Sequence, residues 1–251
     1  MTPEKVIGAL GLPRDAVQPR RVPKKLLSEN IASSSDRRLV TEGVEELAWL
    51  ATLKPSNCGI AGFTDGERTY EELAVLSLLV RPEGKADRLI ELVHRAIPYP
   101  VLLVCEQAPR LCLSLAHKRW SQAKAGSWVV DGDLAIAEMG DGAPPTVVEG
   151  FLEALPLARQ AADSLWTVYE GWMEAVVAYR AALVTGVFGR AATPRDAQAR
   201  REALDACSRL EAEIKALRTA AKGEPQVRRL VDLNMKLKQL EAEYAAVRKR
   251  L

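Results

Sequence analysis

Apolar positions repeat most regularly in the last quarter of the chain. Two stripes at alternating steps of three and four residues flank a short break at Gly223-Glu224-Pro225. Such spacing is typical of helices that pack by heptads, and glycine followed by proline ends one helix and begins the next. We therefore predict an antiparallel coiled-coil hairpin over residues 195–251. Its predicted packing interface consists of Leu210, Ile214, Leu217, Leu230, Leu233, Leu237, Leu240, Tyr244 and Val247.

Another helical stripe precedes the hairpin. Apolar side chains recur at helical spacing from Leu165 to Leu183, and Trp166, Met173 and Val177 widen the stripe. A helix that is apolar over so much of its circumference is normally buried. We predict a long buried helix here, within a helical connector over residues 146–194.

Residues 31–145 change to short apolar runs. A serine cap at Ser33–Asp36 predicts a helix to about Trp49, and residues 85–96 have helical spacing. Five runs predict strands, with a hairpin at Asp65-Gly66 and a turn at Asp131-Gly132-Asp133. These runs lie at residues 60–63, 70–81, 100–106, 110–119 and 127–130. The order predicts an α+β fold with a small, mostly antiparallel sheet, whose strand at Val101–Val104 is covered on both faces.

Residues 1–30 combine a short helix with a basic, proline-rich segment. Thr2-Pro3-Glu4 is typical of a helix start, and residues 1–12 are predicted as that helix. Pro13, Pro19 and Pro23 follow among basic residues. Because proline removes backbone donors and favours extended backbone, we interpret residues 13–25 as an arm or linker.

The overall charge limits what this segment can do. The formal net charge is only +2 over 251 residues, so nucleic-acid binding has to depend on local clusters. Such a cluster is centred on the proline-rich arm and predicts contacts to phosphates. Its residues are Arg20, Arg21, Lys24, Lys25, Arg37, Arg38, Lys118 and Arg119. A solvated linker, or arginines that pair with acids of a partner protein, is the alternative interpretation.

The compartment follows from the cysteines and the start of the chain. Cys58, Cys105, Cys112 and Cys207 are scattered, which is typical of reduced thiols. The first residues lack the pattern of an export signal, and the apolar runs are too short to span a bilayer. We expect a soluble, cytoplasmic protein.

Motifs for catalysis, a metal or a cofactor are not found. The cysteines and the two histidines lack the close spacing of a zinc site, so we expect structural thiols. Cys112 is predicted on the opposite strand face from His117, which disfavours a cysteine–histidine nucleophile. For a metal-dependent nuclease, Glu71, Glu72 and Glu106 lack a lysine partner at close spacing. The sequence therefore leans towards a protein that is not an enzyme and binds no cofactor.

Five segments together resemble the bacterial domain-of-unknown-function family 4391 (DUF4391) over nearly the whole chain. They are Arg21–Lys25, Ala96–Leu103, Ala116–Arg119, Ser127–Val130 and Leu233–Lys238, with Ile97-Pro98-Tyr99-Pro100 the most telling. The family has no assigned reaction. Its members are typically encoded beside helicases and DNA methyltransferases in restriction-modification-like or phage-defence islands.

The resemblance implies a non-enzymatic accessory or adaptor subunit of such an antiviral defence complex. It would bind a larger helicase, nuclease or DNA methyltransferase, and DNA is a further expected partner. A cryptic or degenerate metal-dependent nuclease of the same system is the first alternative. A structural coiled-coil homodimer is the second.

Overall fold

The computed structural model describes residues 1–122, 126–140 and 142–251. These residues form two compact units, Met1–Val176 (unit 1) and Val177–Leu251 (unit 2). Unit 1 is an α+β fold built on a mixed six-stranded sheet in the order β1-β2-β5-β6-β7-β8. The sheet strands are β1 (Val17–Arg21), β2 (Val44–Leu53), β5 (Leu73–Val80), β6 (Val101–Gln107), β7 (Arg110–Trp120) and β8 (Trp128–Glu138). The predicted hairpin at Asp65-Gly66 joins β3 (Phe63–Thr64) to β4 (Thr69–Tyr70) in a separate two-stranded sheet.

The strand directions follow from the connections. The pairs β1–β2, β2–β5, β6–β7 and β7–β8 are antiparallel, whereas β5 and β6 run parallel. A parallel pair needs a crossover, which α5 (Ala86–Ala96) provides. Val101–Val104 is buried, as expected for a strand that is covered on both faces.

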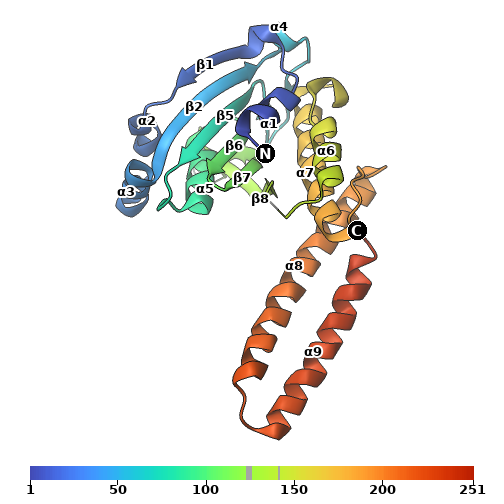
Figure 1. Cartoon of the computed structure of the whole chain (residues 1–251). Helices are drawn as coiled ribbons and strands as arrows, with labels where there is room; N and C mark the ends of the chain where they lie inside the picture. Colours follow the sequence, from blue (N-terminus) through green and yellow to red (C-terminus); the bar gives the residue numbers. More distant parts are fainter. Residues whose placement is uncertain (123–125, 141) are drawn as a thin grey trace. The chain divides into compact units, whose positions relative to one another are not determined.

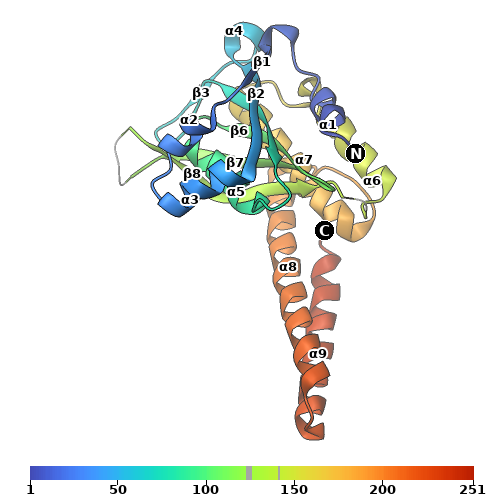
Figure 2. The ribbon, with the colours of Figure 1, turned by 60° about the vertical axis from the view of Figure 1, so that its left-hand side comes forward.

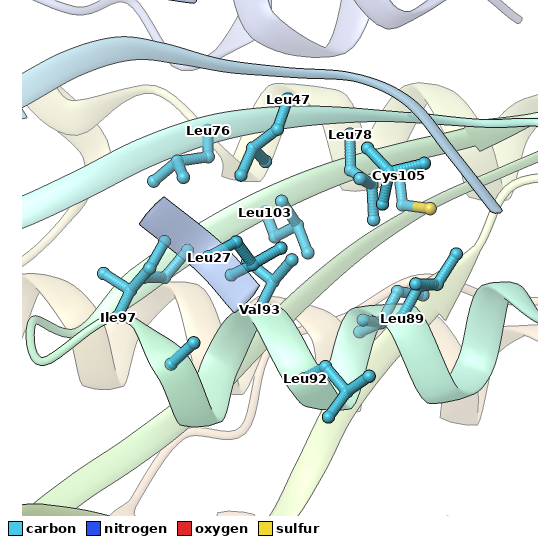
Figure 3. Close-up of a cluster of buried hydrophobic side chains, with 14 of the residues drawn as sticks. Leu27, Leu47, Leu76, Leu78, Leu89, Leu92, Val93, Ile97, Leu103 and Cys105 are labelled. Carbon is cyan, nitrogen blue, oxygen red and sulfur yellow. The ribbon is translucent and has the colours of Figure 1, made fainter. Parts of the chain in front are cut away.

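Helices cover both faces of the sheet (Figure 2). The helices α2 (Lys24–Glu29), α3 (Ser34–Gly43) and α5 lie on one face, where their apolar side chains meet those of β2, β5 and β6 (Figure 3). The other face is covered by α1 (Pro3–Ala9), α6 (Pro145–Ala154) and the first half of α7 (Leu165–Thr185). The remaining short helices are η1 (Arg14–Ala16), α4 (Pro55–Cys58) and η2 (Leu157–Arg159).

The long helix α7 confirms the predicted buried helix. The Tyr169 hydroxyl donates to the Val101 carbonyl (2.7 Å) and accepts from the Ala116 amide (2.9 Å), so it joins α7 to β6 and β7. The Trp172 indole donates to the Leu155 carbonyl (2.8 Å). Both rings are fully buried, which satisfies the rule that buried polar groups find partners.

Three expectations for local structure were wrong. Residues 17–21, which we interpreted as part of an arm or linker, form the edge strand β1, and an edge strand tolerates Pro19. The helix that we predicted to Trp49 ends at Gly43, where a Cβ atom would lie 3.0 Å from Leu89 Cδ1. The predicted turn at Asp131-Gly132-Asp133 lies within β8, where Gly132 has a positive φ of 76° beside an irregular register.

Unit 2 contains the end of α7 and two long helices, α8 (Pro194–Gly223) and α9 (Val227–Arg248). They lie side by side and run in opposite directions (Figure 1). Thr193 caps α8, because its hydroxyl accepts from the Asp196 amide (3.2 Å). None of the helices in the described part of the chain is long and apolar enough to cross a membrane.

Candidate nucleic-acid interface

A surface pocket of about 440 Å³ lies beside the edge strand. Four segments build it: β1, α2, β2 and the chain that leads from α5 into β6. Its lining residues are Arg20, Arg21, Val22, Pro23, Leu26, Leu27, Asn30, Leu47, Trp49, Ala96, Ile97, Pro98 and Tyr99. We call it the β1 pocket. The volume is in the usual range for ligand pockets, and the lining is mainly apolar, as such sites require.

Two aromatic rings and a guanidinium group form one side of this pocket. Tyr99 meets Trp49 edge to face, with ring centroids 6.2 Å apart, and the Arg20 guanidinium lies 5.2 Å from the Trp49 ring centroid. The Trp49 indole is fixed by its bond to the Thr52 hydroxyl (2.7 Å). Tyr99 remains 38% exposed. A fixed, partly open ring next to a guanidinium plane is suited to stacking with a planar group.

The charge of the β1 pocket is positive. Among its lining residues in the described part of the chain, the charged ones are Arg20 and Arg21. Lys24 lies nearby: burial lowers the pKa of Lys24, and the charges of Arg81 and Arg21 lower it further, against a smaller opposing effect of Glu45. These cations are therefore close enough to share one field, which an anionic ligand would relieve.

A second pocket of about 450 Å³ shares Pro98 and Tyr99 with the first. Here the Lys54 amine pairs with Glu72 at 2.8 Å, and Glu72 also raises the pKa of the Tyr99 hydroxyl through its charge. Trp128 lines the pocket and stacks on Trp120 with centroids 3.5 Å apart. Its charge is mixed, so it offers phosphates no comparable attraction.

Lys54 also corrects the expectation that the early glutamates lack a lysine partner. It directly follows β2 and meets Glu72, which directly precedes the neighbouring strand β5, a pairing that linear spacing does not reveal. Glu71 accepts from the Thr64 hydroxyl (3.1 Å). Within residues 1–122, 126–140 and 142–251, no three acidic, histidine or cysteine side chains are grouped to hold a metal ion.

Lys118 has a different place from the one predicted. Its side chain is 1% exposed, and its amine donates to the carbonyls of His94 and Ile97 at the end of α5. Burial lowers its pKa to about 8. Lys118 therefore cannot contact phosphates as we expected; it holds the segment that carries Tyr99 against the sheet.

The other predicted cations do not join the pocket. Lys25 lies 3.9 Å from Glu29, Arg38 pairs with Glu42 (2.7 Å) and Arg119 pairs with Asp131 (3.2 Å), while Arg37 donates to the Ala32 carbonyl (3.3 Å). Of the predicted set, Arg20, Arg21 and Lys24 are brought together. Sequence reasoning missed Trp49 and Tyr99, which line the pocket, and Arg81, whose charge acts on Lys24, because their contacts join distant parts of the chain.

A hydrogen-bonded network of Tyr70, His117 and Glu170 lies on the opposite face of the sheet; Tyr70 is buried, and the other two are partly exposed. The Tyr70 hydroxyl lies 2.7 Å from His117 Nδ1, and His117 Nε2 lies 2.7 Å from Glu170. Trp166 packs over the imidazole with centroids 4.7 Å apart. A carboxylate that orients a histidine is a common catalytic arrangement, but the Tyr70 side chain is completely buried. These hydrogen bonds therefore link β4, β7 and α7.

Cys105, Cys112 and Cys207 are buried, whereas Cys58 is partly exposed. Cys105 and Cys112 face each other across β6 and β7, and both are buried. The hydrogen bond with Cys112, and burial, raise the pKa of Cys105. His94 bonds to Ser114 (2.9 Å), and His117 bonds to Tyr70 and Glu170. Neither histidine is thus engaged with a cysteine.

The helices α8 and α9 contact each other. Leu210 and Ile214 are buried, and the α9 residues Leu230, Leu233, Leu237, Leu240, Tyr244 and Val247 are half-buried. Two polar contacts cross between the helices: Arg218 with Glu241 (2.7 Å) and Tyr244 with Glu211 (2.6 Å). A different face of α9 leaves Val227, Val231 and Met235 exposed by 75%, 51% and 62%. Exposed apolar residues at helical spacing are candidates for a protein contact.

Comparison with known proteins places these observations in a family. No curated protein matches the chain. No solved structure matches it either. Three of the segments on which the resemblance depends, Arg21–Lys25, Ala96–Leu103 and Ser127–Val130, contribute residues to the two pockets. Residues 10–243 match the family described as a domain of unknown function (DUF4391), and the chain therefore belongs to that family.

Proposed function

We propose that this protein is a non-enzymatic accessory or adaptor subunit of a bacterial anti-phage defence or restriction-modification-like complex. Unit 1 contacts DNA through the β1 pocket. Helices α8 and α9 form an antiparallel coiled coil that binds a larger helicase, nuclease or DNA methyltransferase. The family resemblance supports the setting, and the two surfaces support the division of labour.

One observation carries the DNA contact. Arg20 and Arg21 are adjacent residues of an exposed edge strand, and both line a pocket whose charged lining residues, within the described chain, are these two cations. Cations in such a place favour phosphate contacts, because each one that reaches a phosphate releases counterions. Arginines that are already paired with a carboxylate, as Arg38 is with Glu42, have less to gain.

The proposal is tested by charge reversal with a matched control. We expect Arg20→Glu/Arg21→Glu to weaken DNA binding roughly tenfold or more at low salt, and to reduce the salt slope by about 1.4 to 1.8 for two lost contacts. The control, Arg37→Glu/Arg38→Glu, changes the net charge equally on α3, away from the pocket. Fluorescence anisotropy over a salt series measures both quantities. An equal loss in the two variants would mean diffuse charge attraction, and no binding by the wild type would remove DNA from the proposal.

The second alternative, a structural homodimer, has one observation in its favour. The exposed face at Val227, Val231 and Met235 would suit a second copy of α9 as well as a different protein. Heteromeric binding remains our choice because the family resemblance implies a larger partner.

A further inference from the structure

We propose that the β1 pocket binds unpaired bases of single-stranded nucleic acid, stacked against Tyr99, while Arg20 and Arg21 hold the flanking phosphates. This inference deepens the proposed function and rests on its DNA contact. It names the form of nucleic acid that the protein selects.

The lining of the pocket is the first step. A site for phosphates alone needs cations and backbone donors, and it has no use for an apolar wall. The β1 pocket has both cations and an apolar wall: two arginines lie at its β1 side, and apolar side chains such as Leu26, Ile97 and Pro98 line the rest. A base combines an apolar face with a nearby anionic phosphate, so this pairing of surfaces matches a nucleotide unit.

The aromatic geometry is the second step. Tyr99 contacts the Trp49 ring edge to face and the Arg20 guanidinium lies over it, and Trp49 is itself partly buried. Tyr99 is the ring that stays accessible at 38%. Stacking on an aromatic ring needs a base that has left its own stack, because both faces of a base in duplex DNA are covered by neighbours. The pocket therefore favours single strands over duplexes.

The support of Tyr99 is the third step. Pro98 and Pro100 flank it and restrict the backbone. Lys118 holds the preceding turn through the Ile97 carbonyl (2.5 Å). A ring that is fixed before binding loses little conformational freedom on stacking.

The adjoining pocket sets a limit to the site. Glu71 and Glu72 line it together with Lys54, so a phosphate there would meet carboxylates. The strand should therefore pass over the β1 side and not continue towards Trp128. Trp120 is therefore a matched control: it is also 38% exposed, but it stacks on Trp128 beside the other pocket, where the nucleic acid is not expected to bind.

The experiment compares a short labelled single strand with the same strand carrying abasic sites, which keeps every phosphate and removes bases. With the full-length wild type, anisotropy should show tighter binding of the intact strand by roughly 10- to 100-fold. Tyr99→Ala should abolish that difference, while Tyr99→Phe and Trp120→Ala should preserve it. Circular dichroism confirms that each variant is folded.

The remaining outcomes each decide a separate point. Equal binding of intact and abasic strands by the wild type, or a difference that survives in Tyr99→Ala, overturns the base site. If Arg20→Glu/Arg21→Glu still weakens binding in that case, the proposed DNA contact stands alone. If a mononucleotide competes for the pocket as well as the single strand does, the ligand is a free nucleotide and not a nucleic acid, and the base site for single strands is overturned. No binding of any probe would end both proposals.

Discussion

The buried amine of Lys118 makes the stability of unit 1 depend on pH in a way that one substitution should remove. Burial lowers its pKa from 10.5 to about 8, so the folded chain loses this proton at lower pH than the unfolded chain. Between these two values the unfolded state binds more protons than the folded state. The free energy of unfolding should therefore rise with pH in this window.

The size of the effect follows from the two pKa values. From about pH 7.5 to about pH 9.5, a site with pKa values of 10.5 unfolded and about 8 folded should add about 2 kcal/mol to the free energy of unfolding. The range stops below the ordinary pKa of tyrosine. Burial raises the pKa values of Tyr70 and Tyr169, and these groups act with the opposite sign at higher pH.

The assay is denaturant unfolding of wild type and Lys118→Met at both pH values. All five tryptophans of the chain lie within residues 1–176, so their fluorescence follows unit 1 alone. The difference between the two proteins should change by about 2 kcal/mol, because the contributions of other groups cancel. Lys25→Met is the control, since its side chain is 86% exposed. Parallel curves for wild type and Lys118→Met would refute the reasoning, because they would mean that the two carbonyls hold the charge as well as water does.

Two further changes test other parts of the molecule. Burial, and the charge of Lys118, lower the pKa of His94 to about 3. Between about pH 6.5 and about pH 3 the unfolded state therefore binds a proton at this site and the folded state does not. The free energy of unfolding should fall as the pH drops through this range. His94→Gln should flatten this acid limb by on the order of 4 kcal/mol in unfolding experiments; an unchanged limb would show that other groups cause it. On α9, Val231→Glu/Met235→Glu should abolish co-purification of a partner protein from the native host, whereas Asn234→Glu/Gln239→Glu adds the same charge at exposed polar positions and should leave it intact. Loss in both variants, or in neither, would exclude this apolar face as the binding surface.

Much of the fold was accessible from the sequence, because most of its elements have regular patterns. The helices α1, α5 and α7 and the strands β5, β6 and β7 lie close to where spacing predicted them. The strand β2 was mistaken for helix for a specific reason. Register shifts between Val44 and Glu46 and between Trp49 and Ala51 leave Val44, Leu47 and Ala51 buried, a spacing of three and four that imitates a helix.

The candidate site was only partly accessible. Arg20 and Arg21 were selected by charge, but β1 was missed because all five of its residues are exposed and show no alternation. The pairing of Arg20 with Trp49 is set by strand register, and Tyr99 joins them from fifty residues further along the chain. Lys118 was misplaced because its charge suggested a surface residue, whereas the free carbonyls at the end of α5 supply partners inside.

The continuity of α7 has a consequence for synthesis on the ribosome. This helix runs without interruption from Leu165 to Thr185 and so crosses the boundary between the units at Val176. The sheet is complete once Glu138 has been made, but the hydroxyl that links β6 to β7 belongs to Tyr169. Synthesis must therefore continue for at least thirty-one residues, from Glu138 to Tyr169, before α7 can cover its face of the sheet. At about 5 to 20 residues per second this interval lasts seconds, long enough for chaperones to act on the exposed apolar face.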